Sequence, residues 1–400
     1  MSLNSTPSAD RIHIGIFGKR NAGKSSIINA ITGQDLAIVS SVLGTTTDPV
    51  SKAMELLPLG PVVIIDTPGL DDSGELGQER VKKSYQTLNK TDIALLVVDV
   101  TKGISEEDKA IILRINEKKI PLVIAMNKAD LLSAIPTNSD KNTIYVSADT
   151  GLNIYELKEL LGKQVNLKSE TLKIVGDLLS PLDVAVLVVP IDEAAPKGRL
   201  ILPQQQTIRD ILEAGAISVV CKENELTETL KKMSDKPKIV ITDSQVFKKV
   251  SAETPEDVML TSFSILMSRF KGNLETSVKG VTALNRLRDG DTVLISEGCT
   301  HHRQCNDIGT VKIPKLIKQY TGKEINFEFS SGGSFPEDLS KYKLIVHCGG
   351  CTLSEREMNY RVKCAEDSNV PITNYGILIA FVNGILKRSV APFPNISKYL

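Results

Sequence analysis

The sequence predicts an α/β protein built of three domains, and two observations carry that prediction. Short apolar runs of strand length, such as "VVIID" and "VAVLVV", alternate along the chain with segments of helical periodicity. This alternation is typical of parallel sheets covered by helices. The chain has 400 residues, which is longer than one ordinary domain. Polar stretches and restarts of the pattern divide it into residues 1–166, 167–267 and 268–400.

Composition and charge narrow the classes of protein to which this chain can belong. Hydrophobic residues make up 41% of it, enough for packed cores, and 48 basic residues balance 48 acidic ones. A chain without net charge has no overall excess of positive charge that would attract nucleic acid. No apolar run reaches the length of a membrane span, and the N-terminal sequence has no apolar signal segment. We therefore expect a cytoplasmic protein without nucleic-acid or membrane partners, whose six cysteines bind metal or are buried.

The first domain begins with a phosphate-binding sequence. The stretch "RIHIGIFGKRNAGKSSIINAITG" predicts a strand, a glycine loop and a helix, and its loop fits the pattern G-x-x-x-x-G-K-S. Backbone N–H groups of such a loop surround phosphates at the helix N-terminus. Lys24 would reach the β and γ phosphates, and the Ser25 hydroxyl would bind Mg²⁺. The residues expected around the phosphates are Gly18, Asn21, Ala22, Gly23, Lys24, Ser25 and Ser26.

Two further stretches supply groups for the magnesium ion and the γ-phosphate. In "GTTTD", Thr46 is placed as a second protein ligand of Mg²⁺. The buried strand "VVIIDTPG" ends in Asp66, which would hold the water shell of Mg²⁺, and Gly69 would lie near the γ-phosphate. We therefore expect the reaction itself to depend on Lys24, Thr46, Asp66 and Gly69.

The last two stretches of this domain are suited to guanine. "LVIAMNKAD" ends a strand with Asn127, Lys128 and Asp130, and the Asp130 carboxylate can accept two N–H groups of the base. "IYVSA" ends another strand with Ser147 and Ala148, whose backbone would meet the guanine O6. Because the carboxyl ends of parallel strands meet at one edge of a sheet, all five stretches would form one site. The sequence therefore predicts a GTP-binding domain on a parallel sheet.

Two details of this domain concern hydrolysis. The residue after Gly69 is Leu70, where a glutamine could position the attacking water, so we expect slow hydrolysis or another device. The domain resembles the TrmE-Era family of GTPases, in which an asparagine of the phosphate loop binds K⁺, and Asn21 stands at that position. The resemblance implies hydrolysis stimulated by K⁺. The alternative is that Asn21 only shapes the loop.

The middle of the chain predicts a small α/β domain without chemistry of its own. Strands are expected at 183–191, 217–221 and 238–242, with helical periodicity between them. No glycine loop or group of metal-ligand residues occurs there, so spacing or self-association is the expected role. Cys221 ends an apolar run and is expected in the core.

The third domain brings cysteines to the ends of strands. After a helix predicted at 273–288, the strand "DTVLISEGC" leads into Cys299, and "YKLIVHCGGC" leads into His347, Cys348 and Cys351. A third strand, "VPITNYG", ends in polar residues that include Tyr375. Because α/β sheets place sites beyond their carboxyl ends, the three thiols are expected to lie close together.

Three thiolates suit either Zn²⁺ with a fourth ligand or an iron–sulfur cluster. His301, His302 and His347 could complete a Cys₃His zinc site, so the residues by themselves leave both metals open. Cys364 lies within a helical pattern and is expected to pack rather than to bind metal, and Cys305 receives no assignment.

The pattern Cys299-Thr-His301, 45 further residues, then His347-Cys348-Gly-Gly-Cys351 resembles the C-x-H…H-C-x-x-C signature of the FeFe-hydrogenase maturation GTPases, the HydF family. The resemblance covers the whole chain. It implies a central dimerisation domain and a C-terminal domain in which Cys299, Cys348 and Cys351 hold a 4Fe-4S cluster. The candidates for the fourth ligand, or for a place near the cluster, are His301, His347 and Glu297.

The resemblance also implies a function. Such a protein is a GTP-hydrolysing scaffold and carrier, active as a homodimer or tetramer. It receives a two-iron cluster precursor as cargo from two radical-SAM maturases and delivers it to apo FeFe-hydrogenase. The alternative is a ribosome- or tRNA-associated GTPase with a structural zinc domain, which the neutral charge balance disfavours.

Overall fold

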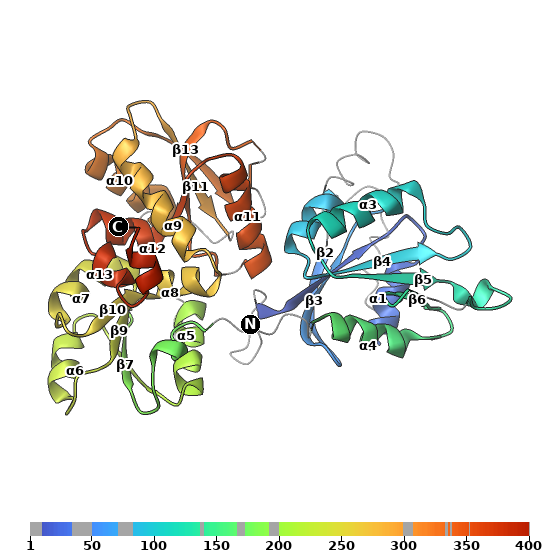
Figure 1. Cartoon of the computed structure of the whole chain (residues 1–400), viewed down its shortest axis with the longest axis horizontal. Coiled ribbons are helices and arrows are strands. Elements are labelled where there is room, and N and C mark those ends of the chain that lie inside the picture. Colours follow the sequence, from blue (N-terminus) through green and yellow to red (C-terminus); the bar gives the residue numbers. More distant parts are fainter. Residues whose placement is uncertain are drawn as a thin grey trace. The chain divides into compact units, whose positions relative to one another are not determined.

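The structure is a computed structural model, and its chain forms two compact units, Met1–Glu170 and Thr171–Leu400. Each unit combines helices with largely parallel sheets, which confirms the predicted α/β class (Figure 1). The residues that the structure describes are 10–33, 50–70, 83–136, 140–165, 173–191, 200–298, 307–332, 335–336, 338–351 and 353–399.

The first unit contains one six-stranded sheet in the order β2-β3-β1-β4-β5-β6. Its strands are β1 (Ile12–Phe17), β2 (Val50–Leu56), β3 (Gly60–Asp66), β4 (Ile93–Asp99), β5 (Leu122–Asn127) and β6 (Thr143–Tyr145). Only the edge strand β2 is antiparallel to its neighbour among these described strands. Its α-helices with described bounds are α1 (Lys24–Thr32), α3 (Glu106–Glu117) and α4 (Ile154–Val165).

Both faces of this sheet are covered, which explains the continuous apolar runs of its strands. Helix α3 covers one face, while α1 and α4 cover the other (Figure 1). Strand β4 is buried along its whole length, as a central parallel strand between two helical layers must be. Along the central strands, polar groups can therefore reach solvent only at the strand ends, which is where the candidate nucleotide residues lie.

The start of helix α3 illustrates how local sequence sets an element boundary. The Ser105 hydroxyl accepts the Asp108 N–H at 3.3 Å, and the Asp108 carboxylate accepts the Ser105 N–H at 2.9 Å. This capping box satisfies two N–H groups that the first helical turn leaves without partners. Ile111 and Ile115, one turn apart, then face the sheet.

The second unit contains two four-stranded parallel sheets, in the orders β10-β9-β7-β8 and β12-β11-β13-β14. The first consists of β7 (Val184–Val188), β8 (Ile217–Cys221), β9 (Ile239–Thr242) and β10 (Met259–Ser262). The second consists of β11 (Thr292–Glu297), β12 (Asn326–Ser331), β13 (Tyr342–His347) and β14 (Ile372–Asn374). The helices are α5 (Leu202–Glu213), α6 (Leu226–Lys232), α7 (Phe247–Glu253), α8 (Phe263–Phe270), α9 (Leu274–Val281), α10 (Ile313–Thr321), α11 (Glu355–Asp367), α12 (Tyr375–Val382), α13 (Leu386–Val390) and α14 (Pro394–Ser397).

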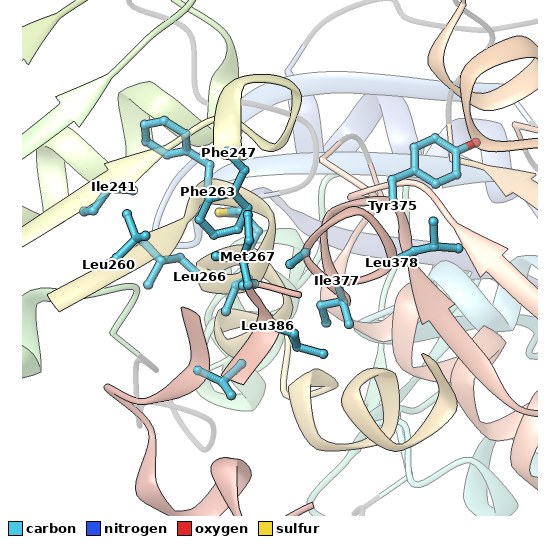
Figure 2. Close-up of a cluster of buried hydrophobic side chains, with 14 of the residues drawn as sticks. Ile241, Phe247, Leu260, Phe263, Leu266, Met267, Tyr375, Ile377, Leu378 and Leu386 are labelled. Carbon is cyan, nitrogen blue, oxygen red and sulfur yellow. The ribbon is translucent and has the colours of Figure 1, made fainter. Parts of the chain in front are cut away.

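One hydrophobic core joins the two sheets of this unit. It contains Phe263 and Leu266 of α8 together with Ile377 and Leu378 of α12, which lie side by side in Figure 2. The middle and C-terminal parts of the chain therefore pack as one body. The predicted boundary after residue 267 falls within α8 and stays a prediction.

A second, smaller core lies on the opposite face of the β11–β13 sheet, under helix α11. It contains Leu294 and Ile345 of the strands and Met358 and Val362 of the helix. Val293 and Ile295, the neighbours of Leu294, belong to the larger core, because alternate residues of a strand point to opposite faces. This alternation decides where the candidate site residues at the strand ends point.

Several expectations from the sequence can be compared with these elements. The segment 273–288 consists of α9 and a 3₁₀ turn at Thr282–Arg286, so the prediction of a single helix there was wrong. The Thr282 hydroxyl donates to the Lys279 carbonyl at 2.8 Å, a local bond that competes with regular helical pairing. Cys221 is buried in the core, as predicted. Within the described part of the chain, none of the helices combines the length and apolar character that a membrane crossing requires.

Candidate functional site

The phosphate loop between β1 and α1 has a shape that only glycines permit at two positions. Gly18 has φ +143° and Gly23 has φ +95°, both outside the range favoured by residues with a side chain. A Cβ atom on Gly18 would lie 2.3 Å from the Val97 carbonyl oxygen, and one on Gly23 would lie 2.2 Å from Asn127 Nδ2. The loop therefore approaches the ends of β4 and β5 closely.

Lys24 is the first residue of α1, and its side chain reaches back to this loop. Its Nζ donates to the carbonyl oxygens of Gly18 and Lys19, each at 2.9 Å. Ser25 and Ser26 follow in the first turn of α1, and Asn21 stands exposed at the loop with φ +64°. A phosphate group at this helix N-terminus would meet an ammonium group that is already held at the loop.

Asp66, at the carboxyl end of β3, has the features of a magnesium-shell residue. It pairs in register with Ile16 of β1, directly before the phosphate loop. Its Oδ1 is buried and has no hydrogen-bond partner in the described part of the chain. Burial raises the pKa of Asp66, and the Lys24 charge offsets part of that rise. A buried carboxylate oxygen without a partner fits a hydrated divalent cation. Thr46, predicted as a direct ligand of Mg²⁺ beside Ser25, lies outside the described residues.

Gly69 and Leu70 follow β3. The Leu70 N–H donates to the Gly18 carbonyl at 3.4 Å, which places this turn against the phosphate loop. The Leu70 side chain is buried in the core under α3. The position that could carry a water-positioning glutamine therefore holds a core residue.

Asn127 joins the phosphate loop to the last guanine stretch. Its Nδ2 donates to the Ala22 carbonyl at 3.0 Å, and its Oδ1 accepts the Ala148 N–H at 3.1 Å. Asp130 is exposed in the short turn after β5, while Ser147 is buried and accepts the Thr150 N–H. The described residues of the predicted guanine site thus meet at one sheet edge, with Asp130 accessible to a base.

Asp99 belongs to this edge but was not among the residues singled out from the sequence. Its Oδ2 lies 2.6 Å from Lys128 Nζ. Burial alone would raise the pKa of Asp99, but hydrogen bonds from Lys128 and Thr101 outweigh it and hold the pKa below its ordinary value. Asp99 therefore fixes the lysine of the guanine stretch. Its position at the end of the buried run "IALLVVD" was the available signal.

The second group of candidates lies at the carboxyl ends of β11 and β13. Cys348 Sγ accepts the N–H of Gly298 at 3.0 Å and the N–H of Gly350 at 3.4 Å. Gly298 directly precedes Cys299 in the chain, so the two strand ends meet as predicted. Cys299 and His301 themselves lie outside the described residues, as do His302 and Cys305.

Strand pleating separates the residues of this site into two sets. Ser296 and His347 are register partners on β11 and β13, and both point towards Arg361 of α11. Glu297 and Cys348, one residue further along each strand, point to the other face, where Tyr375 lies. His347 and Cys348 are adjacent in sequence but belong to different surroundings.

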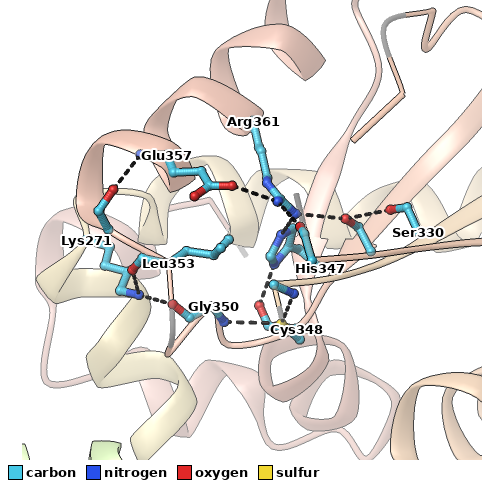
Figure 3. A network of polar contacts seen from close by, with 12 residues as sticks. Lys271, Ser330, His347, Cys348, Gly350, Leu353, Glu357 and Arg361 are labelled. Atoms are coloured by element: carbon cyan, nitrogen blue, oxygen red, sulfur yellow. Dashed lines mark hydrogen bonds and ion pairs between the residues drawn. The ribbon is translucent and has the colours of Figure 1, made fainter. Parts of the chain in front are cut away.

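His347 is held entirely by protein groups. Its Nδ1–H donates to the Cys348 carbonyl at 2.8 Å, and its Nε2 accepts from Arg361 Nη1 at 3.1 Å (Figure 3). Burial and then the Arg361 charge lower the pKa of His347 to about 3. A neutral imidazole has one donor and one acceptor, and both are engaged here.

Arg361 is the largest fully buried side chain that the structure describes, and no sequence motif pointed to it. Besides His347, its guanidinium donates to Glu357 Oε1 at 3.0 Å, to Gly332 O at 2.6 Å and to Ser296 Oγ at 3.4 Å. These four acceptors compensate the loss of hydration that burial of a charge entails. Arg361 thereby ties α11 to the ends of β11, β12 and β13.

On the other face, Glu297 is 3% exposed and accepts a hydrogen bond from the Tyr375 hydroxyl at 3.3 Å. Burial, followed by the charges of Glu297 and Cys348, raises the pKa of Tyr375, so the hydroxyl stays protonated. A Cβ atom on Gly309 would lie 2.4 Å from Glu297 Oε1 and from the Tyr375 oxygen. This close approach keeps the Glu297 carboxylate at the ends of β11 and β13, beside Cys348.

The remaining cysteines differ in their surroundings. Cys351 is half-buried at the end of the Cys348–Cys351 loop, whereas Cys364 packs against the core under α11, as predicted. Within the described ranges, no three histidine, cysteine, aspartate or glutamate side chains are grouped as a complete metal site. The predicted set has three cysteines, of which the structure describes Cys348 and Cys351.

Three family models match separate parts of the chain. A model described as "50S ribosome-binding GTPase" matches residues 13–128. A model of the hydrogen maturase F dimerization domain matches residues 174–272, and one of the hydrogen maturase F tetramerization domain matches residues 275–392.

Similar proteins match the first unit. The tRNA modification GTPase MnmE of Legionella pneumophila (strain Corby) is 40% identical over 152 residues, which cover 38% of this chain and 33% of the relative. GTPase Der of Kosmotoga olearia is 30% identical over 183 residues, covering 40% of this chain and 41% of the relative. The chain thus spans less than half the length of either curated relative.

Solved structures that match include the G domain of the T. maritima FeoB iron transporter, with 22% identity and a TM-score of 0.30 over 39% of this chain and 99% of that one. Aquifex aeolicus Era bound to GDP and AlF₄⁻ matches with 16% identity and a TM-score of 0.34, over 80% of this chain and 93% of that one.

Proposed function

The chain belongs to the hydrogen maturase F family and carries a GTPase domain, and from this premise we propose that it is a scaffold and carrier protein. It hydrolyses GTP, and its C-terminal part holds a 4Fe-4S cluster. Its cargo is the two-iron precursor of the hydrogenase active-site cluster, received from two radical-SAM maturases and delivered to apo FeFe-hydrogenase.

The observation that carries this proposal is the pair of backbone N–H groups directed at Cys348 Sγ. The donors are Gly298, which precedes Cys299, and Gly350, which precedes Cys351. Amide hydrogen bonds to sulfur stabilise the thiolate form and are a regular feature of iron–sulfur ligation. Two such donors at one sulfur suit a ligand thiolate better than a packing thiol.

In this proposal, Cys299, Cys348 and Cys351 hold the cluster. A 4Fe-4S cluster held by three thiolates would have one iron whose fourth ligand can be replaced. Of the described candidates for that position, His347 faces α11 with both nitrogens engaged, whereas Glu297 faces the same side as Cys348. The arrangement supports Glu297 as the ligand and His347 as a neighbour that shapes the cysteine loop.

The nucleotide chemistry rests on the residues around the phosphate loop. Lys24 binds the β and γ phosphates, Ser25, Thr46 and Asp66 bind Mg²⁺ or its water shell, and Asn21 binds K⁺. The Leu70 side chain is buried and is not available to orient the attacking water, which supports slow hydrolysis assisted by K⁺. A rate of GTP hydrolysis that is equal in K⁺ and in Na⁺ would refute the assignment of Asn21.

Self-association is the proposed role of the central domain. Strand β8 is an edge of its sheet in the described part of the chain, and it exposes Ile217 and Val220. An exposed apolar edge strand readily pairs with a second strand. We infer that the pairing strand belongs to a second copy of the chain, since the match over this region is to a dimerization domain. If an Ile217→Glu variant still sedimented as a dimer, this inference would be contradicted.

Anaerobic iron, sulfide and zinc analysis of the purified chain tests the cluster directly. We expect about four irons and four sulfides per chain. Cys299→Ser, Cys348→Ser and Cys351→Ser should each lose them, because each removes a thiolate ligand. Cys364→Ser and Cys221→Ser are matched controls, since both thiols pack in cores, and both variants should keep the full content.

Zinc without sulfide in the wild-type chain would contradict the proposal. The chain would then be a GTPase with a structural metal domain, and salt-dependent RNA binding would be the next property to measure. Loss of iron from the Cys364→Ser control would show that the ligand set is assigned incorrectly.

A further inference from the structure

Lys271 is a buried lysine of the second unit that no motif of the sequence contains. It follows the last residue of α8, and its N–H donates to the Met267 carbonyl at 3.0 Å. The residue is only 5% exposed, although lysine is among the residues least often buried. It lies in the segment matched by the dimerization domain, not in the segment that contains the cysteines.

The Lys271 ammonium reaches into the loop that carries Cys348 and Cys351. Its Nζ donates to the carbonyl oxygen of Gly350, and to that of Leu353 at 3.1 Å (Figure 3). These two carbonyls lie on either side of Cys351 in the chain. One amino group thus holds the loop both before and after the second described cysteine.

The loop has its own reason for approaching Lys271 closely. Gly350 has φ +60°, the left-handed conformation that glycine adopts without strain. A Cβ atom at this position would lie 3.2 Å from Met358 Sδ and 3.8 Å from Lys271 Nζ. In this conformation the Gly350 carbonyl points to the ammonium while its N–H points to Cys348 Sγ. The same glycine therefore links the cation to the thiol.

Burying an ammonium group is costly unless dipoles or negative charge compensate it. The two carbonyl oxygens supply dipoles. Three thiolates on a 4Fe-4S core would add a net negative charge close by, which increases when the cluster takes up an electron. A positive charge beside the cysteine loop stabilises the more negative, reduced state.

We propose that Lys271 is a positioning residue that fixes the Cys348–Cys351 loop from the end of α8 and raises the reduction potential of the cluster. The inference rests on the proposed function, because it requires a cluster at these cysteines. It goes beyond that function by assigning a part in the cluster site to a residue outside the matched segment that contains the cysteines.

The test compares Lys271→Met, Lys271→Gln and Lys271→Arg with the wild-type chain. Lys343→Met is the matched control, because Lys343 lies on β13, which leads into the same loop, but its side chain is exposed. Iron and sulfide content, the EPR spectrum of the reduced cluster and its reduction potential are measured on each protein. In the cluster-free proteins, the rate of Cys351 alkylation is followed by mass spectrometry.

At the wild-type midpoint potential, we expect the ratio of reduced to oxidised cluster to fall about tenfold in the Met and Gln variants, equivalent to about 59 mV for one electron. The EPR spectrum should broaden or shift, and Cys351 of the cluster-free Met variant should react faster. The Arg variant should restore the potential, and the Lys343→Met control should match the wild type.

Several outcomes would overturn the inference. An unchanged potential in Met and Gln variants that retain full iron would exclude the effect of charge, and unchanged Cys351 reactivity would exclude the positioning. If the circular dichroism spectrum showed that Lys271→Met does not fold, the wild type would be compared with the Gln variant, which keeps a hydrogen-bond donor. A wild-type chain without iron and sulfide would instead refute the proposed function itself.

Discussion

The phosphate loop and the cysteine loop both follow a buried parallel strand, yet different means hold them in shape. The phosphate loop is formed by glycine conformations and by Lys24, which bonds to carbonyls five and six residues earlier. The cysteine loop is held by Lys271, which follows α8, while Arg361 of α11 bonds to His347, the residue before the loop. The first loop is local in sequence, and the second depends on packing across the unit.

This difference decides what a substitution can do at each place. A change in the phosphate loop alters contacts to a ligand and few contacts of the core. A change at the cations under the cysteine loop removes hydrogen bonds from buried acceptors, which lowers the stability of the folded state before any ligand is considered. Variants at the two loops should therefore separate binding from folding.

We expect the largest effect from Arg361→Met, on the free energy of unfolding of the second unit. It leaves the buried Glu357 carboxylate without its guanidinium partner, and breaking a buried pair from one side costs about 3–5 kcal/mol of unfolding free energy. Urea unfolding of the second unit, followed by circular dichroism, measures the loss. The double variant Arg361→Met/Glu357→Gln should recover part of it, because the remaining charge is removed as well.

A matched control exists elsewhere in the same unit. Arg209 and Glu213 form an ion pair of the same residue types and spacing along α5, but the two side chains are 76% and 48% exposed. Arg209→Met should change the unfolding free energy by less than about 1 kcal/mol. Equal losses at the two arginines would show that burial does not distinguish them.

The next effect is on Lys24→Ala, which should weaken GTP binding about a hundredfold. The variant loses charge-assisted hydrogen bonds to the phosphates, worth about 1.5–3 kcal/mol each. Titration with a fluorescent GTP analogue measures the dissociation constant. Lys109→Ala, at an exposed lysine of the same unit, should bind GTP as the wild type does. An unchanged dissociation constant for Lys24→Ala would remove the phosphate loop from the nucleotide site.

The smallest effect concerns Asp66→Asn in the nucleotide-free protein. Because burial raises the folded-state pKa of Asp66, its contribution to stability is fully present below the unfolded pKa and is lost as pH rises through the folded pKa. At pH 7 the Asn variant should therefore be slightly more stable than the wild type, and the difference should vanish towards pH 4. Thermal unfolding at several pH values measures it.

With Mg²⁺ and GTP present the order should reverse, since the neutral amide of the Asn variant would be a poorer partner of the magnesium shell than the carboxylate. A wild-type protein that remained less stable than Asp66→Asn in saturating Mg²⁺ and GTP would contradict the role assigned to Asp66.

Prediction from sequence succeeded where position follows from spacing along the chain. The phosphate loop, Asp66 and the guanine stretches each lie at or just after the end of a strand, so their meeting at one edge follows from parallel pairing. The nearness of Cys348 to the end of β11 was predicted in the same way, and the Gly298 hydrogen bond agrees with it. Asp99 could have been found by this rule but was overlooked.

Residues that act through packing were not predictable in this way. Arg361 lies on α11 within a polar helical pattern, and its sequence neighbours do not reveal that it is buried beside His347. Lys271 lies almost eighty residues before Gly350, and no periodicity relates them. The direction of His347 also depended on the pleat of β13, since a shift by one residue would have turned it to the face of Cys348.

The sequence by itself determined the GTPase motifs, the α/β class and the set of cysteines, because each depends on residue types at fixed spacing. Only the tertiary structure decided that one core joins the middle and C-terminal parts, and that buried Lys271 and Arg361 hold the cysteine loop and the histidine before it. A buried charge is stable only where partners from several elements converge on it, and that convergence exists only in the folded chain.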